Sequence, residues 1–152
     1  MSREIKFRGK RVDNGQWVYG YLVKNTITTR IISDFALVRS DAHTEDSLNH
    51  CSGYFDIVDT ETVGQFTGLT DKNGKDIYEG DIVHCKGYGI SYIGERKTYR
   101  VAYNESTAEF ELINTQRHTY SDKSFGYSTE RILTQHSFEV IGNVYDNPEL
   151  IK

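Results

Sequence analysis

Apolar and polar residues alternate along the first part of the chain with the two-residue period of a β-strand. Ile5 and Phe7 alternate with basic residues, and the run ends at Asp-Asn-Gly at 13–15. Asn-Gly and Asp-Gly pairs supply the positive φ angles that tight hairpin turns require. Residues 3–23 therefore predict a β-hairpin. Three aromatic residues share one face of its return strand, namely Trp17, Tyr19 and Tyr21.

The same turn pattern recurs in TGLTDKNGKDIYEGDIVH at 67–84, where Asn73-Gly74 separates two strand-like runs. Ser128–Gln135 is compatible with a short helix, with Ser128 or Thr129 as its N-cap. The polar, patternless stretch 40–53 predicts a surface loop. Further runs rich in β-branched and aromatic residues predict strands within 26–39, 98–113 and 139–147.

Composition agrees with a strand-rich chain that has a core. Its 152 residues fit one ordinary domain or two small modules, and 37% are hydrophobic. The apolar share includes 11 Tyr and 7 Phe against one Met, which favours strands over helices. We find neither a signal-like apolar run at the start nor an apolar stretch of membrane-spanning length, and we expect a cytoplasmic protein.

Three motifs carry a family resemblance. They are REIKFRGKRVDNGQWVYG at 3–20, QFTGLTDKNGKDIYEGDIV at 65–83 and IGNVYDNPEL at 141–150. In sequence, order and spacing they resemble the YopX family of phage and prophage proteins. The resemblance implies an origin in a mobile element and a C-terminal half shaped like a small SH3-type barrel. It implies no activity and no catalytic residue.

The acidic residues around the second turn have two interpretations. Asp76, Tyr78, Glu79 and Asp81 are candidate ligand-binding residues, because carboxylates on one face of a strand could converge. The alternative is structural: Asp71 closes the Asn-Gly turn through backbone hydrogen bonds, and Glu79-Gly80-Asp81 forms a second turn. We favour the structural interpretation.

Two adjacent His-Cys pairs, His50-Cys51 and His84-Cys85, raise the question of a zinc site. Zinc ligands are usually two to four residues apart, so that both side chains reach one ion. Adjacent residues on a strand point to opposite faces. We therefore expect neither a metal nor a cofactor.

Basic residues are concentrated near the N-terminus, although the net charge of the chain is −4. Residues 1–40 carry eight Lys or Arg against three acids, whereas residues 41–83 carry two against ten. Aromatic rings can stack on unpaired bases while cations neutralise phosphates. The candidate nucleic-acid-binding residues are Lys6, Arg8, Lys10, Arg11 and Trp17. The acidic sequence pI of about 5.7 argues against a phosphate-binding surface that dominates the molecule.

We therefore expect a mainly β (β-rich α+β) protein with an N-terminal β-hairpin subdomain, 1–66, and an SH3-like small barrel, 67–152, sharing one core. The leading functional hypothesis is a non-enzymatic protein-binding or adaptor module with an unidentified protein partner. The alternatives are a nucleic-acid-binding accessory factor and a small-ligand binder or enzyme using the acidic cluster at 71–81. Exposed strand edges make a homo-oligomer compatible with the sequence.

Overall fold

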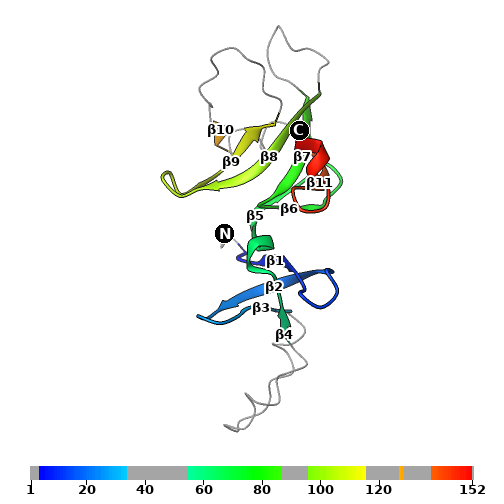
Figure 1. Cartoon of the computed structure of the whole chain (residues 1–152). Helices are drawn as coiled ribbons and strands as arrows, with labels where there is room; N and C mark the ends of the chain where they lie inside the picture. The colour runs from blue at the N-terminus through cyan, green and yellow to red at the C-terminus, as the bar shows by residue number, and fades with distance from the viewer. Residues whose placement is uncertain (1–3, 34–54, 87–95, 116–126, 129–137, 152) are drawn as a thin grey trace, which may run out of the picture. The chain divides into compact units, whose positions relative to one another are not determined.

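The computed structural model describes residues 4–33, 55–86, 96–115, 127–128 and 138–151. The chain divides into two compact units, unit 1 (Met1–Phe66) and unit 2 (Thr67–Lys152). Every strand pair whose register is defined is antiparallel, and the helices of the described ranges are short 3₁₀ segments (Figure 1). The predicted mainly β class is confirmed.

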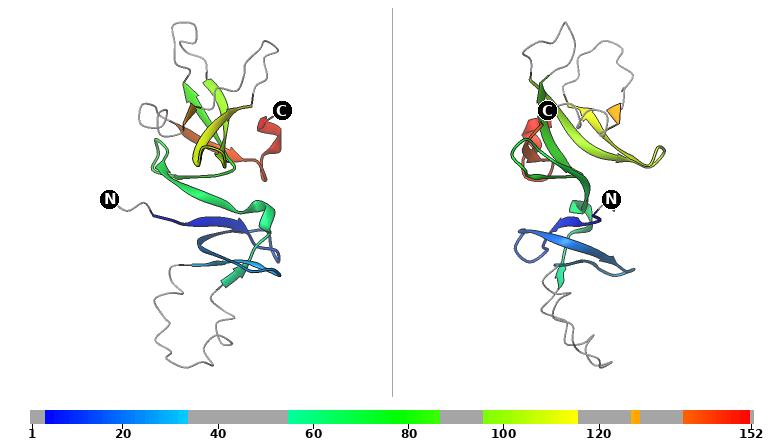
Figure 2. Two further views of the ribbon diagram at one scale, coloured as in Figure 1. Left: turned by 90° about the vertical axis from the view of Figure 1, so that its left-hand side faces the viewer. Right: turned by 180° about the vertical axis from the view of Figure 1, so that it is seen from behind.

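Unit 1 is a twisted antiparallel sheet in which the strands lie in the order β4-β3-β2-β1-β5 (Figure 2). Its strands are β1 (Phe7–Lys10), β2 (Trp17–Lys24), β3 (Thr29–Ile32), β4 (Phe55–Ile57) and the beginning of β5 (Gly64–Thr70). β1 and β2 form the hairpin that the alternating pattern predicts, with Phe7 opposite Gly20 and Lys10 opposite Trp17.

The turn of this hairpin uses the residues that the sequence marks. Gly15 has a φ of 70°, and its N–H donates to the Arg11 carbonyl at 2.9 Å. The Asn14 side-chain oxygen accepts a hydrogen bond from the Gln16 N–H at 2.9 Å. A glycine adopts this φ without the steric cost that a Cβ would bring, so the Asn-Gly pair fixes the position of the turn.

One face of the unit 1 sheet carries a small core. Ile31 and Val58 are almost fully buried there, at 1% and 3% exposure. They pack so close to the backbone that a Cβ built on Gly9 would lie 3.0 Å from the Val58 Cβ. The 3₁₀ segment η2 (Thr60–Thr62) closes the end of the core, because the Thr62 hydroxyl accepts the Lys10 N–H at 2.9 Å.

Unit 2 contains a five-stranded antiparallel sheet in the order β10-β9-β8-β7-β11, and a hairpin in which β5 leads into β6. A 3₁₀ segment, η3 (Pro148–Ile151), follows the last strand. The elements are β6 (Asp76–Tyr78), β7 (Asp81–Lys86), β8 (Arg96–Asn104), β9 (Glu109–Asn114), β10 (Tyr127–Ser128) and β11 (Glu139–Asn143).

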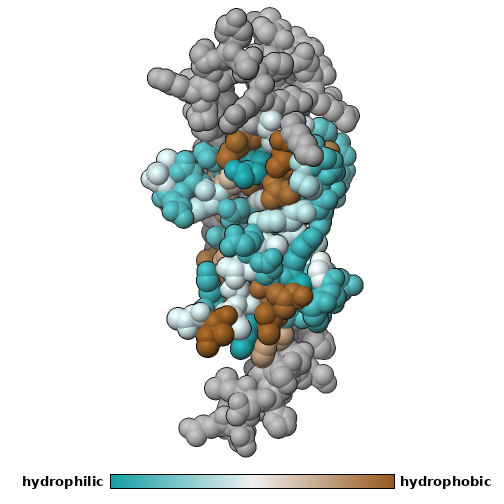
Figure 3. Space-filling view, viewed as in Figure 1, coloured by the Kyte–Doolittle hydropathy of each residue, from teal (hydrophilic) through white to brown (hydrophobic). Residues whose placement is uncertain are grey.

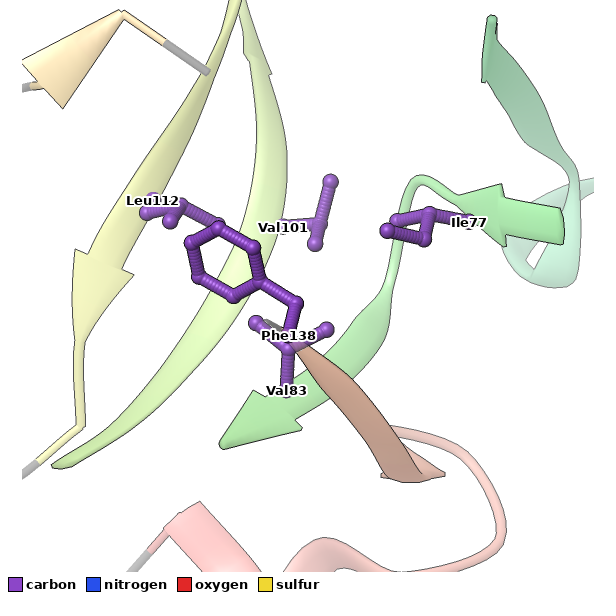
Figure 4. Packing of buried hydrophobic residues seen from close by; sticks show 5 residues of the cluster. All are labelled: Ile77, Val83, Val101, Leu112 and Phe138. Atoms are coloured by element: carbon purple, nitrogen blue, oxygen red, sulfur yellow. The ribbon is translucent and has the colours of Figure 1, made fainter. Parts of the chain in front are cut away.

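The core of unit 2 is one cluster of apolar side chains from successive strands. Phe138, immediately before β11, is 1% exposed and lies among residues of β6, β7, β8 and β9 (Figure 4). The other buried members are Ile77, Val83, Val101 and Leu112. This burial of apolar surface is the main contribution to the stability of the unit.

The sheet of unit 2 is open among the described residues, so the expected SH3-like small barrel is not closed there. β10 and β11 form its two edges and do not pair with each other. The outer edge of β11 instead meets the Asn-Gly turn: the Lys72 N–H donates to the Phe138 carbonyl, and the Val140 N–H donates to the Asp71 carboxylate. These hydrogen bonds occupy groups that a closing strand would need.

Two other predicted elements cannot be compared with the structure. The surface loop expected at 40–53 lies outside the described residues. The short helix considered at 128–135 does too, apart from Ser128, which belongs to β10.

Candidate functional site

The register of β1 and β2 places basic and aromatic side chains on one side of the unit 1 sheet. Lys10 lies opposite Trp17, and Arg8 lies opposite Tyr19. Directly opposed residues of antiparallel strands project to the same face. The residues between them in the sequence, such as Gly9, lie on the opposite face, which packs on the core.

Trp17 is the centre of a cation–π cluster on this side. The Arg8 guanidinium carbon lies 4.7 Å from the centroid of the Trp17 ring, and the Lys10 ammonium lies 5.6 Å from it. Both distances fall within the range in which the ring quadrupole attracts a cation. Arg8 is only 5% exposed, so its main contact is with the protein rather than with solvent.

The same alternation continues on both flanks of the sheet. Arg30 of β3 lies over the Phe55 ring of β4 at 4.4 Å, and Lys6 lies over the Phe66 ring at 4.4 Å. We call this side the cation–aromatic face. Its defining residues are Lys6, Arg8, Lys10, Trp17, Tyr19, Tyr21, Arg30 and Phe55.

The cation–aromatic face has a marked excess of positive charge and exposes aromatic surface. Its described strand positions carry Arg8, Lys10 and Arg30 and no carboxylate. On the flank before β1, Lys6 forms an ion pair of 3.3 Å with the Glu4 carboxylate. Tyr19 and Tyr21 are 50% and 42% exposed. Figure 3 shows hydrophobic residues at the surface of unit 1, next to hydrophilic ones.

Arg11, the fourth predicted cation of the N-terminal hairpin, does not join this face. Its guanidinium pairs with the Asp13 carboxylate at 2.6 Å and with the Asp56 carboxylate at 3.1 Å. The hydrogen bond between Arg11 and Asp13 raises the pKa of Arg11 and lowers that of Asp13. The structure therefore brings Lys6, Arg8, Lys10 and Trp17 together and separates Arg11 from them.

Asp71 in unit 2 has the turn-closing geometry that the sequence indicates. One carboxylate oxygen accepts the backbone N–H groups of Asn73 and Lys75 at 2.7 and 2.9 Å, and the other accepts that of Val140 at 3.1 Å. Burial raises the pKa of Asp71, but these backbone hydrogen bonds and the charge of Lys75 outweigh it and lower the pKa below its ordinary value.

The candidate ligand-binding residues form a second turn. Asp81 is 1% exposed, and its carboxylate accepts the Tyr78 N–H at 2.8 Å, while Tyr78 itself is 3% exposed. Gly80 between them has a φ of 82°. The Glu79 carboxylate accepts the Tyr103 N–H at 3.4 Å, and Asp76 is partly buried at the start of β6. Asp81 thus orients backbone from a buried position.

Metal-ligand geometry is not found in the described part of the chain. None of its groups of three or more His, Cys, Asp or Glu could hold a metal ion. His84 shares a hydrogen bond of 3.1 Å with the Thr98 hydroxyl. The first His-Cys pair, His50-Cys51, lies outside the described residues.

Sequence reasoning missed Arg30 and Phe55 as members of the cation–aromatic face. Arg30 sits within TTRII at 28–32, a run in which apolar and polar residues do not alternate, so the local pattern does not reveal which face Arg30 occupies. Phe55 follows more than twenty residues later in the sequence and joins Arg30 only through the pairing of β3 with β4. A non-local strand pairing of this kind leaves no local signal.

The fold and this face define a two-unit, mainly β protein with a basic, aromatic surface on its N-terminal unit. The chain belongs to the YopX protein family, whose sequence pattern it matches over residues 6–152. The comparison with curated proteins finds no match. Within the described ranges, none of the helices is both long enough and apolar enough to span a bilayer.

The chain is also similar to a solved structure, protein EF1440 from Enterococcus faecalis. The two share 25% sequence identity with a TM-score of 0.55, over 99% of this chain and 100% of that one. The likeness therefore extends through both units of the chain.

Proposed function

We propose that this chain is a non-enzymatic binding protein that acts as a nucleic-acid-binding accessory factor, with the cation–aromatic face as its binding surface. One observation carries the proposal: Arg8, Lys10 and Arg30 occupy strand positions of one sheet face with exposed tyrosines, and the described strand positions of that face carry no carboxylate. A phosphate backbone is complementary to such a surface in charge, and the bases are complementary to its rings.

The overall acidity of the chain is compatible with this function, because the charges are segregated. Asp56 lies on the other side of the sheet, where it pairs with Arg11. Its negative charge is therefore offset there and does not reduce the positive charge of the cation–aromatic face. Electrostatic attraction to a polyanion depends on the local field within about one Debye length, roughly 10 Å at 0.1 M salt. We place the protein in the cytoplasm, where such a partner is accessible.

A second candidate is the protein-binding or adaptor role that the sequence first suggests. It is favoured by Val23 and Ile57, which are 47% and 41% exposed and lie on either side of Arg30 in the strand register. Aromatic residues and Arg are enriched at protein interfaces, and an exposed apolar row adds to that resemblance. The charge of the remaining face leads us to prefer nucleic acid.

Fluorescence anisotropy with labelled single-stranded and duplex oligonucleotides tests the proposal. Replacing both Lys6 and Lys10 with Gln should weaken binding at least tenfold at low salt. It should also reduce the slope of log K against log[salt] by roughly 1.5, since each phosphate contact contributes about 0.7–0.9. Lys24→Gln is the matched control, because Lys24 projects to the opposite face. No binding of either oligonucleotide at low salt would refute the proposal, as would an equal loss in Lys24→Gln.

A further inference from the structure

The spacing of the two exposed tyrosines sets a condition on any nucleic acid that stacks on them. Tyr19 and Tyr21 occupy alternate positions of β2 and are 50% and 42% exposed. Alternate residues of a strand are about 7 Å apart along its axis. Successive stacked bases in a duplex strand are separated by only about 3.4 Å. Two neighbouring bases can therefore lie on the two tyrosines only if they have separated from each other.

Trp17 has a different role from the tyrosines. Its ring carries the Arg8 guanidinium at 4.7 Å and the Lys10 ammonium at 5.6 Å, so its face is engaged by cations of the protein. Arg8 is 5% exposed and does not reach an incoming phosphate. Arg8 and Trp17 are thus positioning residues: Lys10 lies over the Trp17 ring, opposite Trp17 in the register and one alternate strand position from Tyr19.

We propose that the substrate class of this face is single-stranded nucleic acid, with two successive unpaired bases stacked on Tyr19 and Tyr21 and the adjacent phosphate on Lys10. This inference rests on the proposed nucleic-acid function and goes beyond it, because it excludes the duplex as the preferred partner. The stack gives affinity without base-specific hydrogen bonds, since every base has a π-face. The same contacts apply to DNA and to RNA.

Three eight-residue probes test the inference by anisotropy: oligo(dT), a duplex, and an abasic oligonucleotide that keeps the phosphates but lacks bases. We expect oligo(dT) to bind most tightly. Tyr19→Ala and Tyr21→Ala should each weaken its binding roughly 5- to 100-fold, the range for one base–aromatic stack. Binding of the abasic probe should change less than twofold. Tyr19→Phe should retain the affinity, because the ring remains.

The control is Tyr103→Ala. Tyr103 is 41% exposed, close to the exposure of Tyr21, but it belongs to β8 in unit 2 and packs edge-on against Phe110 at 5.3 Å. Its removal should leave all three affinities unchanged. Trp17 is the only tryptophan, so an unaltered emission spectrum shows that the unit 1 variants have kept their fold.

The outcomes distinguish a failure of the single-strand inference from a failure of the proposed nucleic-acid-binding function. If all three probes bind equally well and neither tyrosine variant matters, the single-strand inference is wrong while nucleic-acid binding stands. If none of the probes binds at low salt, both are wrong. A photo-crosslinker at position 19 whose adducts keep their size after nuclease treatment would assign the face to a protein partner and overturn the inference.

Discussion

The carboxylate of Asp71 accepts a hydrogen bond of 3.1 Å from the backbone N–H of Val140, which lies 69 residues further along the chain. The other oxygen of the same carboxylate holds the Asn73 and Lys75 N–H groups of the local turn. One side chain therefore closes the Asn-Gly turn and fixes that turn to the edge of β11. A single substitution at Asp71 should disturb both.

Asp71→Ala should lower the free energy of unfolding by about 3–5 kcal/mol, because it leaves three backbone donors without their acceptor. Each loss costs about 1–3 kcal/mol, and these part-buried groups fall near the lower end of that range. Asp71→Asn should cost less, about 1–3 kcal/mol. The carbonyl oxygen of Asn can still accept the hydrogen bonds from the N–H groups of the turn. Its NH₂ group is a donor and cannot accept the hydrogen bond from the Val140 N–H. Urea denaturation followed by circular dichroism measures both values.

Lys72→Ala is the control for this series. Lys72 is adjacent to Asp71 and forms an ion pair of 2.8 Å with Glu139 of β11, but both side chains are more than a third exposed. Exposed pairs contribute little, so the loss should stay below about 1 kcal/mol. A Lys72 variant as damaged as Asp71→Ala would show that charge pairing, and not the buried carboxylate, fixes β11.

The contribution of the Asp71 carboxylate to the free energy of unfolding should decrease as the pH falls. Its pKa is lowered in the folded protein by the backbone hydrogen bonds that outweigh burial, whereas in the unfolded chain it is about 3.9. The stabilisation is therefore fully present above about pH 4 to 5 and is lost as the pH falls through the lowered folded value. The gap in unfolding free energy between wild type and Asp71→Asn should be constant from pH 7 to 5 and narrow below 4. A gap that widens on acidification would contradict the assignment.

The hairpins were predictable because their signals are local. Asn14-Gly15 and Asn73-Gly74 mark turns at which the glycines adopt φ angles of 70° and 81°. The interpretation of Asp71 as a turn-closing residue also holds, since its nearest partners lie two and four residues away. Turn geometry of this kind is set by a few neighbouring residues, and sequence reasoning reaches it.

The non-local pairings were not predictable. Nothing around Val140 indicates that its N–H meets Asp71, or that β11 pairs with β7 and leaves the unit 2 sheet open. The cation–aromatic face was found only in its β1–β2 part, because Arg30 and Phe55 join it through the register of β3 and β4. Such registers depend on the global packing of apolar faces.

Two glycines of the unit 1 hairpin should respond differently to alanine. Gly20 has a φ of 152°, and a Cβ there would collide with the backbone carbonyl of Ile32, with its carbon 2.8 Å away. Gly15 has a φ of 70° and open space around it. We expect Gly15→Ala to cost about 1–2 kcal/mol from the left-handed conformation alone. Gly20→Ala should separate β2 from β3 and cost more than about 3 kcal/mol.

Trp17 fluorescence measures the unfolding of both glycine variants directly, because the only tryptophan lies in the same strand as Gly20. The urea midpoint should shift slightly for Gly15→Ala and strongly for Gly20→Ala. Equal, small shifts would mean that β3 can move away from β2 without loss, and that the close approach of Gly20 to Ile32 is not needed for the sheet.

Phe138→Ala should be the most damaging single substitution of the unit 2 core. Phe138 is 1% exposed and contacts a cluster drawn from β6, β7, β8 and β9, so its removal leaves a cavity that several strands line. Phe-to-Ala changes in cores cost about 3–5 kcal/mol, whereas Phe138→Leu should cost less because most of the volume is retained. Amide hydrogen exchange at Val83 and Val101 measures the loss of stability within the cluster itself. If exchange there is unchanged in Phe138→Ala, the ring does not hold these strands together, and the core assignment for unit 2 fails.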